Sequence, residues 1–179
     1  MSPLANYQAL VARVDALCRQ IGAEWGEQIV CRQGCDSCCR HLTLFPVEAA
    51  ALAAALHQLP EATVAALQQR ARSATIDDPC PLLVAGSCQL YAARPLICRT
   101  HGLPLLIKGT DGPRVDYCAQ NFAGVASLPA AAVIDLERLN SALVAINQLY
   151  LRDSQGDAMP ASERIAIAAA LLLRESGEK

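Results

Sequence analysis

The sequence predicts a mainly α protein: a compact helical domain with an irregular, cysteine-rich metal-binding region and one short β-hairpin. Three observations support this fold class. Hydrophobic residues make up 53% of the chain and are mostly alanine and leucine, aromatic residues make up only 4%, and nine residues are cysteine. Alanine and leucine are good helix formers. The length of 179 residues suits one core, so we expect a single domain over residues 1–179.

The first predicted element is a helix over residues 3–29. Its apolar residues recur at spacings of three, four and seven, which is a helical stripe: Leu4, Leu10, Val11, Val14, Leu17, Cys18, Ile21 and Trp25. Ser2 followed by Pro3 suits a helix start. Because Cys18 lies on this stripe, we expect a buried core thiol there and not a metal ligand.

The middle of the chain combines two alanine-rich helices with irregular segments. Residues 46–59 and 61–74 are predicted to be helices separated by a proline. Residues 77–90 are rich in proline, glycine and cysteine and should be irregular. Residues 94–100 are predicted to form a helical turn.

A hairpin and two further helices are predicted to follow. Residues 103–107 and 114–117 are expected to form two short strands around a glycine-containing turn. Residues 132–151 and 162–175 carry apolar stripes typical of helices that face a core or a partner helix. The cysteine-rich region, residues 31–118, is therefore expected between N-terminal (3–29) and C-terminal (132–175) helices.

Charge and hydropathy exclude several classes of partner. A net charge of -2 gives no broad basic surface, so we expect no nucleic acid partner. We see no secretory signal and no stretch of the ~20 apolar residues that a membrane span needs, so we expect a cytoplasmic protein without a membrane partner. Disulfides are rare in that compartment, and nine cysteines therefore indicate metal binding.

Four cysteines form a tight first group with the pattern C-x3-C-x2-C-C: Cys31, Cys35, Cys38 and Cys39. Gly34 should allow the chain to curl so that the sulfur atoms converge. Two cysteines separated by two residues are a standard pair for one ion or cluster. Adjacent side chains usually diverge, so Cys38 and Cys39 should serve either two neighbouring sites or different metal atoms of one cluster.

Four more cysteines are spread further along the chain: Cys80, Cys88, Cys98 and Cys118. Together with the first group they supply eight thiolates, and we predict all eight as metal ligands. Eight thiolates suit two four-thiolate sites, or one cluster with thiolates left for a second metal or for redox chemistry. An iron-sulfur cluster, of the 4Fe-4S type, is preferred over zinc because the adjacent pair fits a multinuclear centre.

Positive side chains near the cysteines could balance the charge of such a centre. Arg94 and Arg99 are the preferred candidates for binding around the cofactor, and Arg32, Arg40 and Arg114 are further ones. His41 and His101 each lie within three residues of a cysteine. Because eight thiolates are available, we expect roles beside the ligands or at the surface for both.

The cysteine region resembles the YkgJ-type cysteine-cluster family, also called CxxCxxCC proteins, over about half of the chain. The resemblance rests on these residues: Gly34-Cys35 to Cys39-Arg40, Cys80-Pro81-Leu82, Gly86, Cys88 with Tyr91, and Arg94-Pro95 with Cys98-Arg99. Cys31 departs from the pattern, since three residues separate it from Cys35. The resemblance implies zinc or iron binding, with methyl transfer to flagellin lysines in one branch whose surrounding sequence differs.

Three interpretations of function follow. The first is an iron-sulfur protein for electron transfer, sensing or assembly, with a redox or protein partner. The second is a structural zinc module whose helical faces bind a partner. The third is a cluster-dependent enzyme for methyl transfer or other redox chemistry, because Cys31, Cys35 and Cys38 have the spacing found in radical S-adenosylmethionine enzymes. Those enzymes need a βα barrel that this sequence does not predict, so the first is preferred.

Overall fold

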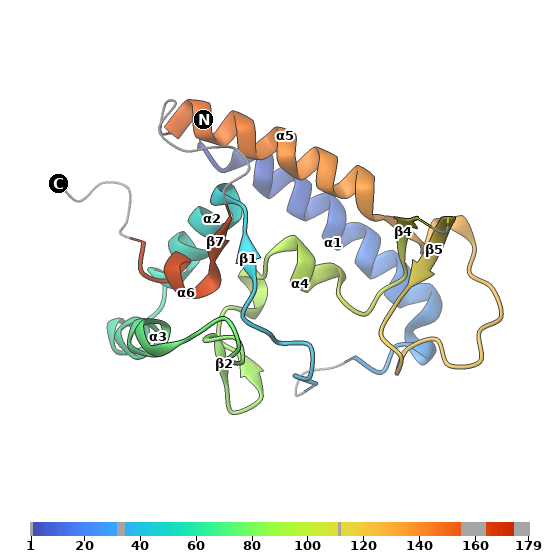
Figure 1. Ribbon diagram of the computed structural model, residues 1–179, viewed down its shortest axis with the longest axis horizontal. Coiled ribbons are helices and arrows are strands. Elements are labelled where there is room, and N and C mark those ends of the chain that lie inside the picture. The colour runs from blue at the N-terminus through green and yellow to red at the C-terminus, as the bar shows by residue number, and fades with distance from the viewer. Residues whose placement is uncertain (1, 32–34, 111, 155–163, 174–179) are drawn as a thin grey trace.

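The computed structural model describes residues 2–31, 35–110, 112–154 and 164–173 (Figure 1). Its α-helices are α1 (Ala5–Trp25), α2 (Pro46–Leu56), α3 (Glu61–Ser73), α4 (Leu96–Thr100), α5 (Leu136–Ser154) and α6 (Ile167–Ala170). Its strands are β1 (Thr43–Leu44), β2 (Leu83–Val84), β3 (Ser87–Cys88), β4 (Leu105–Gly109), β5 (Gly112–Asp116), β6 (Ile134–Asp135) and β7 (Ile165–Ala166). Helices thus dominate the described residues, as the composition predicts.

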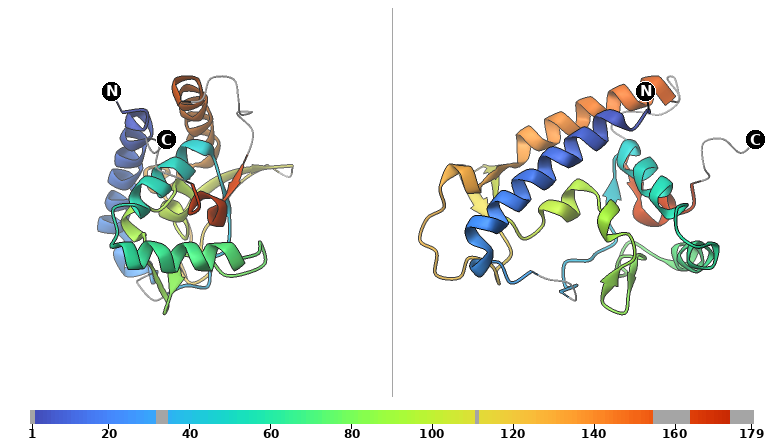
Figure 2. Two further views of the ribbon diagram at one scale, coloured as in Figure 1. Left: turned by 90° about the vertical axis from the view of Figure 1, so that its left-hand side faces the viewer. Right: turned by 180° about the vertical axis from the view of Figure 1, so that it is seen from behind.

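The two longest helices, α1 and α5, run side by side along one face of the molecule (Figures 1 and 2). Tyr7 and Val14 of α1 pack with Leu143 of α5, and Val47 of α2 and Leu96 of α4 complete this cluster from below. The remaining apolar stripe of α1 also packs into this cluster or the next one along the helix. The predicted stripe is therefore confirmed as a core-facing surface.

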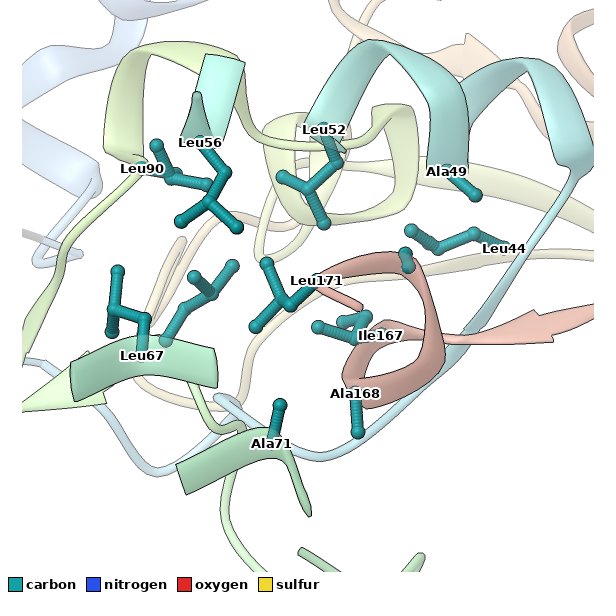
Figure 3. Close-up of a cluster of buried hydrophobic side chains, with 12 residues drawn as sticks. Leu44, Ala49, Leu52, Leu56, Leu67, Ala71, Leu90, Ile167, Ala168 and Leu171 are labelled. Atoms are coloured by element: carbon teal, nitrogen blue, oxygen red, sulfur yellow. The ribbon is translucent and has the colours of Figure 1, made fainter. Parts of the chain in front are cut away.

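A second apolar core lies between α2, α3 and α6 (Figure 3). Leu52 and Leu56 of α2 meet Leu67 of α3 and Leu171 just after α6, and all four are almost completely buried. Burying one leucine side chain contributes about 1.5–3 kcal/mol. This core lies directly beside the cysteine-rich segments, because Cys80 and Cys88 pack against its edge.

Strands β4 and β5 pair antiparallel, with Leu105 opposite Asp116, and β6 adds to β4 in parallel. Two of these strands are predicted from the sequence, and β6 is not. Residues 77–90, predicted to be irregular, contain the antiparallel pair β2 and β3. The link between these two strands is tight, since Ala85 and Gly86 have φ values of 49° and 73°.

The last predicted helix, residues 162–175, is the clearest error in the predicted fold. The structure has strand β7 at its start, followed by the four-residue α6. Residues 162, 163, 174 and 175 lie outside the described residues. Strand β7 pairs with β1, placing Ile165 opposite Leu44, and this pairing overrides the local preference for helix.

Two helix boundaries also differ from the sequence analysis. Helix α5 begins only at Leu136, after a 3-10 turn at Ala130–Ala132 and strand β6. Helix α1 ends at Trp25 and continues as a 3-10 turn, Gly26–Gln28. No helix in the described parts of the chain is both long enough and apolar enough to cross a bilayer.

Candidate metal centre

Seven of the eight predicted ligands line one cavity of about 140 Å3: Cys31, Cys35, Cys38, Cys39, Cys80, Cys88 and Cys98. The cavity lies between the segment before β1, the β2–β3 pair and α4. Much of the remaining lining is aliphatic, from Leu42, Leu82, Leu83, Leu90, Ile97 and Ile167. The cysteines are unpaired thiols, each partly exposed. The structure therefore brings together cysteines that lie far apart in the sequence.

A tight turn holds the adjacent cysteines Cys38 and Cys39. The Cys39 backbone N–H donates to the carbonyl of Asp36 at 2.8 Å, and Arg40 forms a bridge with Pro79 on the opposite segment. The Cys80 backbone N–H then donates to the carbonyl of Cys39 at 3.0 Å. These contacts align the two cysteine-bearing segments without a long sheet.

The β2–β3 pair places Cys88 close to Cys80. Leu83 pairs with Cys88, and the Leu83 N–H donates to the carbonyl of Cys80 at 2.9 Å. Arg70 of α3 holds this loop in place, because its Nε and Nη2 donate to the carbonyls of Pro81 and Leu83 at 3.1 and 2.9 Å. The positions of both cysteines thus depend on the packing of α3.

Cys98 lies on the short helix α4, which a buried carboxylate holds in place. Glu48 is 4% exposed, and its Oε1 accepts the N–H of Leu96 at 3.1 Å, at the start of α4. Its Oε2 accepts the N–H of Phe45 at 3.2 Å, before α2. Burial raises the pKa of Glu48 despite these bonds. Glu48 therefore joins the starts of two helices behind the Cys98 side of the cavity.

Cys31 and Cys118 meet at Gly102, away from the β2–β3 pair. A Cβ atom built on Gly102 would lie 3.0 Å from Cys31 Sγ and 3.5 Å from Cys118 Cβ. Asn121 is 1% exposed, and its Nδ2 donates to Cys31 Sγ at 3.3 Å and to the carbonyl of Gly102 at 2.7 Å. Its Oδ1 accepts the N–H of Val30 at 3.0 Å. This buried amide fixes the position of the Cys31 thiol.

Burial is the largest influence on the pKa of the innermost thiols. Together with smaller effects of neighbouring cysteine charges, it raises the pKa of Cys80 to about 11, although a hydrogen bond from the Leu82 backbone opposes it, and the pKa of Cys98 to about 12. Without metal these thiols keep their protons at neutral pH. A metal ion that binds thiolates must therefore displace protons from them.

The described residues fit a thiolate-bound metal in two respects. The cavity collects soft sulfur donors, and much of its remaining lining is aliphatic. In addition, the buried Nε of Arg94 has no hydrogen-bond acceptor among the described residues. A thiolate centre would supply the negative charge that this donor lacks. No three His, Cys, Asp or Glu side chains among the described residues are already arranged to hold an ion, so binding requires the thiols to move inward.

Arg94 and Arg99, both predicted to lie around the cofactor, have different positions. Arg94 lines the cavity, with its guanidinium carbon 3.5 Å from the centroid of the Tyr91 ring. The Arg99 side chain is 8% exposed and forms an ion pair with Asp15 of α1 at 2.8 Å. Arg99 also donates to the carbonyls of Ala92 and Arg94, so its guanidinium links α1 to α4. These partners occupy the Arg99 guanidinium, and Arg99 is not among the residues that line the cavity.

The remaining candidates near the cysteines also have defined places. His41 is buried and uses both ring nitrogens: Nε2 accepts the N–H of Ala168 at 3.0 Å, and Nδ1 contacts the carbonyl of Thr75 at 2.6 Å. His101 is exposed at the edge of the cavity. Cys18 is only half-buried, and its thiol lies 3.7 Å from the carbonyl of Arg99.

The arginines near the cysteines complete this comparison. Arg40 is exposed and lines the cavity, whereas Arg114 is exposed on β5 and does not. Arg32 and Gly34 lie outside the described residues.

Sequence reasoning missed three residues that position the site: Glu48, Gly102 and Asn121. Glu48 three residues after Phe45 is a recognisable helix-start signal, but its bond to α4 spans 48 residues of sequence. Gly102 and Asn121 both contact Cys31, but they lie far from it in the sequence. No local sequence pattern links them to Cys31. Their roles follow only from the tertiary structure.

The fold and site therefore define a mainly helical protein with a cysteine-lined cavity. Residues 30–119 match the CxxCxxCC family, described as a "putative zinc- or iron-chelating domain". The match spans half of the chain, and the protein belongs to this family. No curated protein and no solved structure matches the chain.

Proposed function

We propose that this protein is an iron-sulfur protein that exchanges electrons with a partner, with the eight clustered cysteines as metal ligands. The observation that carries the proposal is the collection of seven thiols around one small, largely aliphatic cavity. Cysteine thiolates are the usual ligands of iron-sulfur clusters, and a bound cluster of the 4Fe-4S type would supply one-electron chemistry. The reducing cytoplasm is the compartment in which such thiols stay free.

Arg94 supports a negatively charged group in the cavity. Its guanidinium lies against the Tyr91 ring, and its buried Nε has no acceptor within the described part of the chain. The charge of Arg94 also lowers the pKa of Cys88, opposing the larger effect of burial. Hydrogen bonds and positive charge near cluster sulfur atoms stabilise the reduced, more negative state. We therefore assign to Arg94 the role of tuning the centre.

The edge of the cavity offers a place for a partner to approach. Tyr91 and Ile97 both line the cavity, and they are 54% and 49% exposed. Ile97 directly precedes Cys98, so a protein covering this edge would come close to a predicted ligand. This position favours electron exchange over a closed structural role.

Anaerobic purification followed by visible absorption and by analysis of iron, sulfide and zinc tests the proposal. We expect a brown protein that contains iron and acid-labile sulfide, with visible absorption that decreases on chemical reduction and returns on reoxidation. The Cys18→Ser variant is the matched control, because this thiol lies outside the cavity, and it should keep its colour. A colourless protein with stoichiometric zinc and no iron would contradict the proposal.

A structural zinc protein is the second candidate, and one observation favours it. Short hydrogen-bonded contacts, such as Arg40 with Pro79 and Cys80 with Cys39, are what join the cysteine-bearing segments. Zinc held by four thiolates commonly fixes such segments and is redox-inactive. The metal analysis described above separates the two candidates directly.

A further inference from the structure

We propose that a groove between α1 and α2 binds a small, uncharged amphiphile, with an aliphatic chain and one hydrogen-bonding head group of the primary amide class. The groove has a volume of about 510 Å3 and is lined by residues of both helices, by Gln58 just after α2, and by Ala93 and Arg99. It shares no lining residue with the cysteine-lined cavity. The proposal therefore does not depend on which metal the cysteines bind.

The walls of the groove are formed largely by short aliphatic side chains. Five alanines line it: Ala12, Ala51, Ala54, Ala55 and Ala93. Alanine leaves room between two helices that a larger side chain would fill. Binding sites for small ligands commonly have volumes of about 300–1,000 Å3 and mostly apolar linings. An aliphatic chain lying along these alanines would be removed from water, which favours binding.

Tyr7 supplies a hydrogen-bonding group to the groove. Its side chain packs in the core with Val14 and Leu143, and the residue is only 4% exposed. Its hydroxyl forms no hydrogen bond with any described residue, yet Tyr7 lines the groove. Burial, followed by the negative charge of Glu48, raises the pKa of Tyr7, so the hydroxyl keeps its proton at neutral pH. Buried hydroxyls usually have a partner, and a ligand atom in the groove would provide one.

The charges in the groove cancel. Among the described residues that line it, only Asp15 and Arg99 are charged. Arg99 Nη1 donates to both carboxylate oxygens of Asp15 at 2.8 Å, and its other two nitrogens donate to the carbonyls of Ala92 and Arg94. All three guanidinium nitrogens thus have partners within the protein. A charged ligand would lose hydration without gaining a free counter-charge, so the groove favours an uncharged one.

The polar groups of the groove suit a head group that both donates and accepts. The Tyr7 hydroxyl can donate, and the side-chain amides of Gln8 and Gln58, which also line the groove, donate and accept. A primary amide can accept from Tyr7 while its own N–H donates to a glutamine carbonyl. We therefore expect this class of head group, joined to a chain that lies along the alanines.

NMR chemical shifts of alanine methyl groups, measured on the full chain at neutral pH, test the proposal. Three probes share one aliphatic chain and differ in charge: octanamide is neutral, octylamine is a cation and octanoate is an anion. Octanamide should shift the Ala12 and Ala54 methyl signals to saturation and bind about tenfold more tightly than either charged probe. Propanamide has the same head group with a shorter chain, and it should bind at least about tenfold more weakly than octanamide.

Two alanines of α1 provide matched variants. Ala12 and Ala16 are both exposed, but only Ala12 lines the groove. Ala12→Leu should place a larger side chain in the groove and weaken octanamide binding by about tenfold, whereas Ala16→Leu should bind like the unaltered protein. Tyr7→Phe removes a hydroxyl that has no described partner, so it should fold normally and bind octanamide about fivefold more weakly, the usual effect of one neutral hydrogen bond.

Several results would overturn the proposal. The absence of a saturable shift with octanamide would refute the site, and equal effects of the two leucine variants would place binding elsewhere. Tighter binding of octylamine or octanoate would refute the uncharged class of ligand. Shifts of the Ala12 and Ala54 signals that depend on protein concentration without any probe would show that a second copy of the chain occupies the groove instead.

Discussion

Replacing Gly102 by alanine should disturb the predicted metal site around Cys31 and Cys118 and leave the helical cores in place. Gly102 has a φ of +85°, a left-handed conformation that costs an alanine about 1–2 kcal/mol. The new Cβ would also lie 3.0 Å from Cys31 Sγ and 3.1 Å from Asn121 Nδ2, so at least one of them must shift. Loss of one or two hydrogen bonds of Asn121 adds about 1 kcal/mol for each bond. We therefore expect a total loss of about 2–4 kcal/mol.

Gly124→Ala is the matched control for the backbone cost. Gly124 has a similar φ of +80°, but an added Cβ there would meet nothing within 4 Å. Urea unfolding of the reduced, metal-free protein should therefore show a loss of about 1–2 kcal/mol for Gly124→Ala. Cobalt binding should be unchanged in Gly124→Ala, whereas Gly102→Ala should bind less cobalt because the Cys31 thiol is displaced. Equal stability and equal metal content in the two variants would refute the reasoning, because the contact with Cys31 is their main difference.

Other predictions test the surroundings of the site. Because burial holds the pKa of Cys80 near 11 and that of Cys98 near 12, metal binding at neutral pH should release one proton for each thiol that becomes a ligand. Affinity should therefore rise with pH between 6 and 8, which titration calorimetry in two buffers can check; a pH-independent affinity would contradict it. Arg99→Met should lower the free energy of unfolding by about 2 kcal/mol, by urea titration, without changing metal content. His41→Leu should cost a similar amount, because the buried N–H of Ala168 and the carbonyl of Thr75 lose their partner, and loss of metal in this variant would make His41 a ligand. Arg94→Met should lower the reduction potential of the bound cluster in voltammetry, whereas Arg94→Lys should keep most of the original potential.

The helices could be predicted where local patterns and tertiary packing agree. In α2, Pro46 begins the helix and Glu48 supports its start, so composition and position both indicate the observed element. Residues 165–170 have an equally apolar, alanine-rich sequence, yet Ile165 and Ala166 pair with β1. The difference lies in a partner more than 100 residues away, which a local pattern cannot reveal.

The β2–β3 pair shows a different limit of sequence reasoning. Ala85 and Gly86 both have positive φ, as a tight two-residue hairpin link requires. Asparagine or aspartate before the glycine would have indicated this turn, but alanine gives no such signal. Likewise, the spacing predicts that the cysteines lie together, and seven of them line one cavity, whereas which cysteines lie side by side depends on where α4 and the Gly102 segment lie.

The packing of the helices suggests how metal binding relates to folding. The cluster of α1, α2 and α5 is apolar and includes none of the predicted ligands, while the α2, α3 and α6 core involves only Cys80 and Cys88, at its edge. Small zinc domains that lack such cores unfold without metal. Here the helical cores supply their own stability, so the free energy of metal binding is available to draw the thiols inward around the cavity. The metal-free and loaded forms should then differ mainly at the cavity edge beside Tyr91 and Ile97, which is also where a partner could sense whether the centre is present.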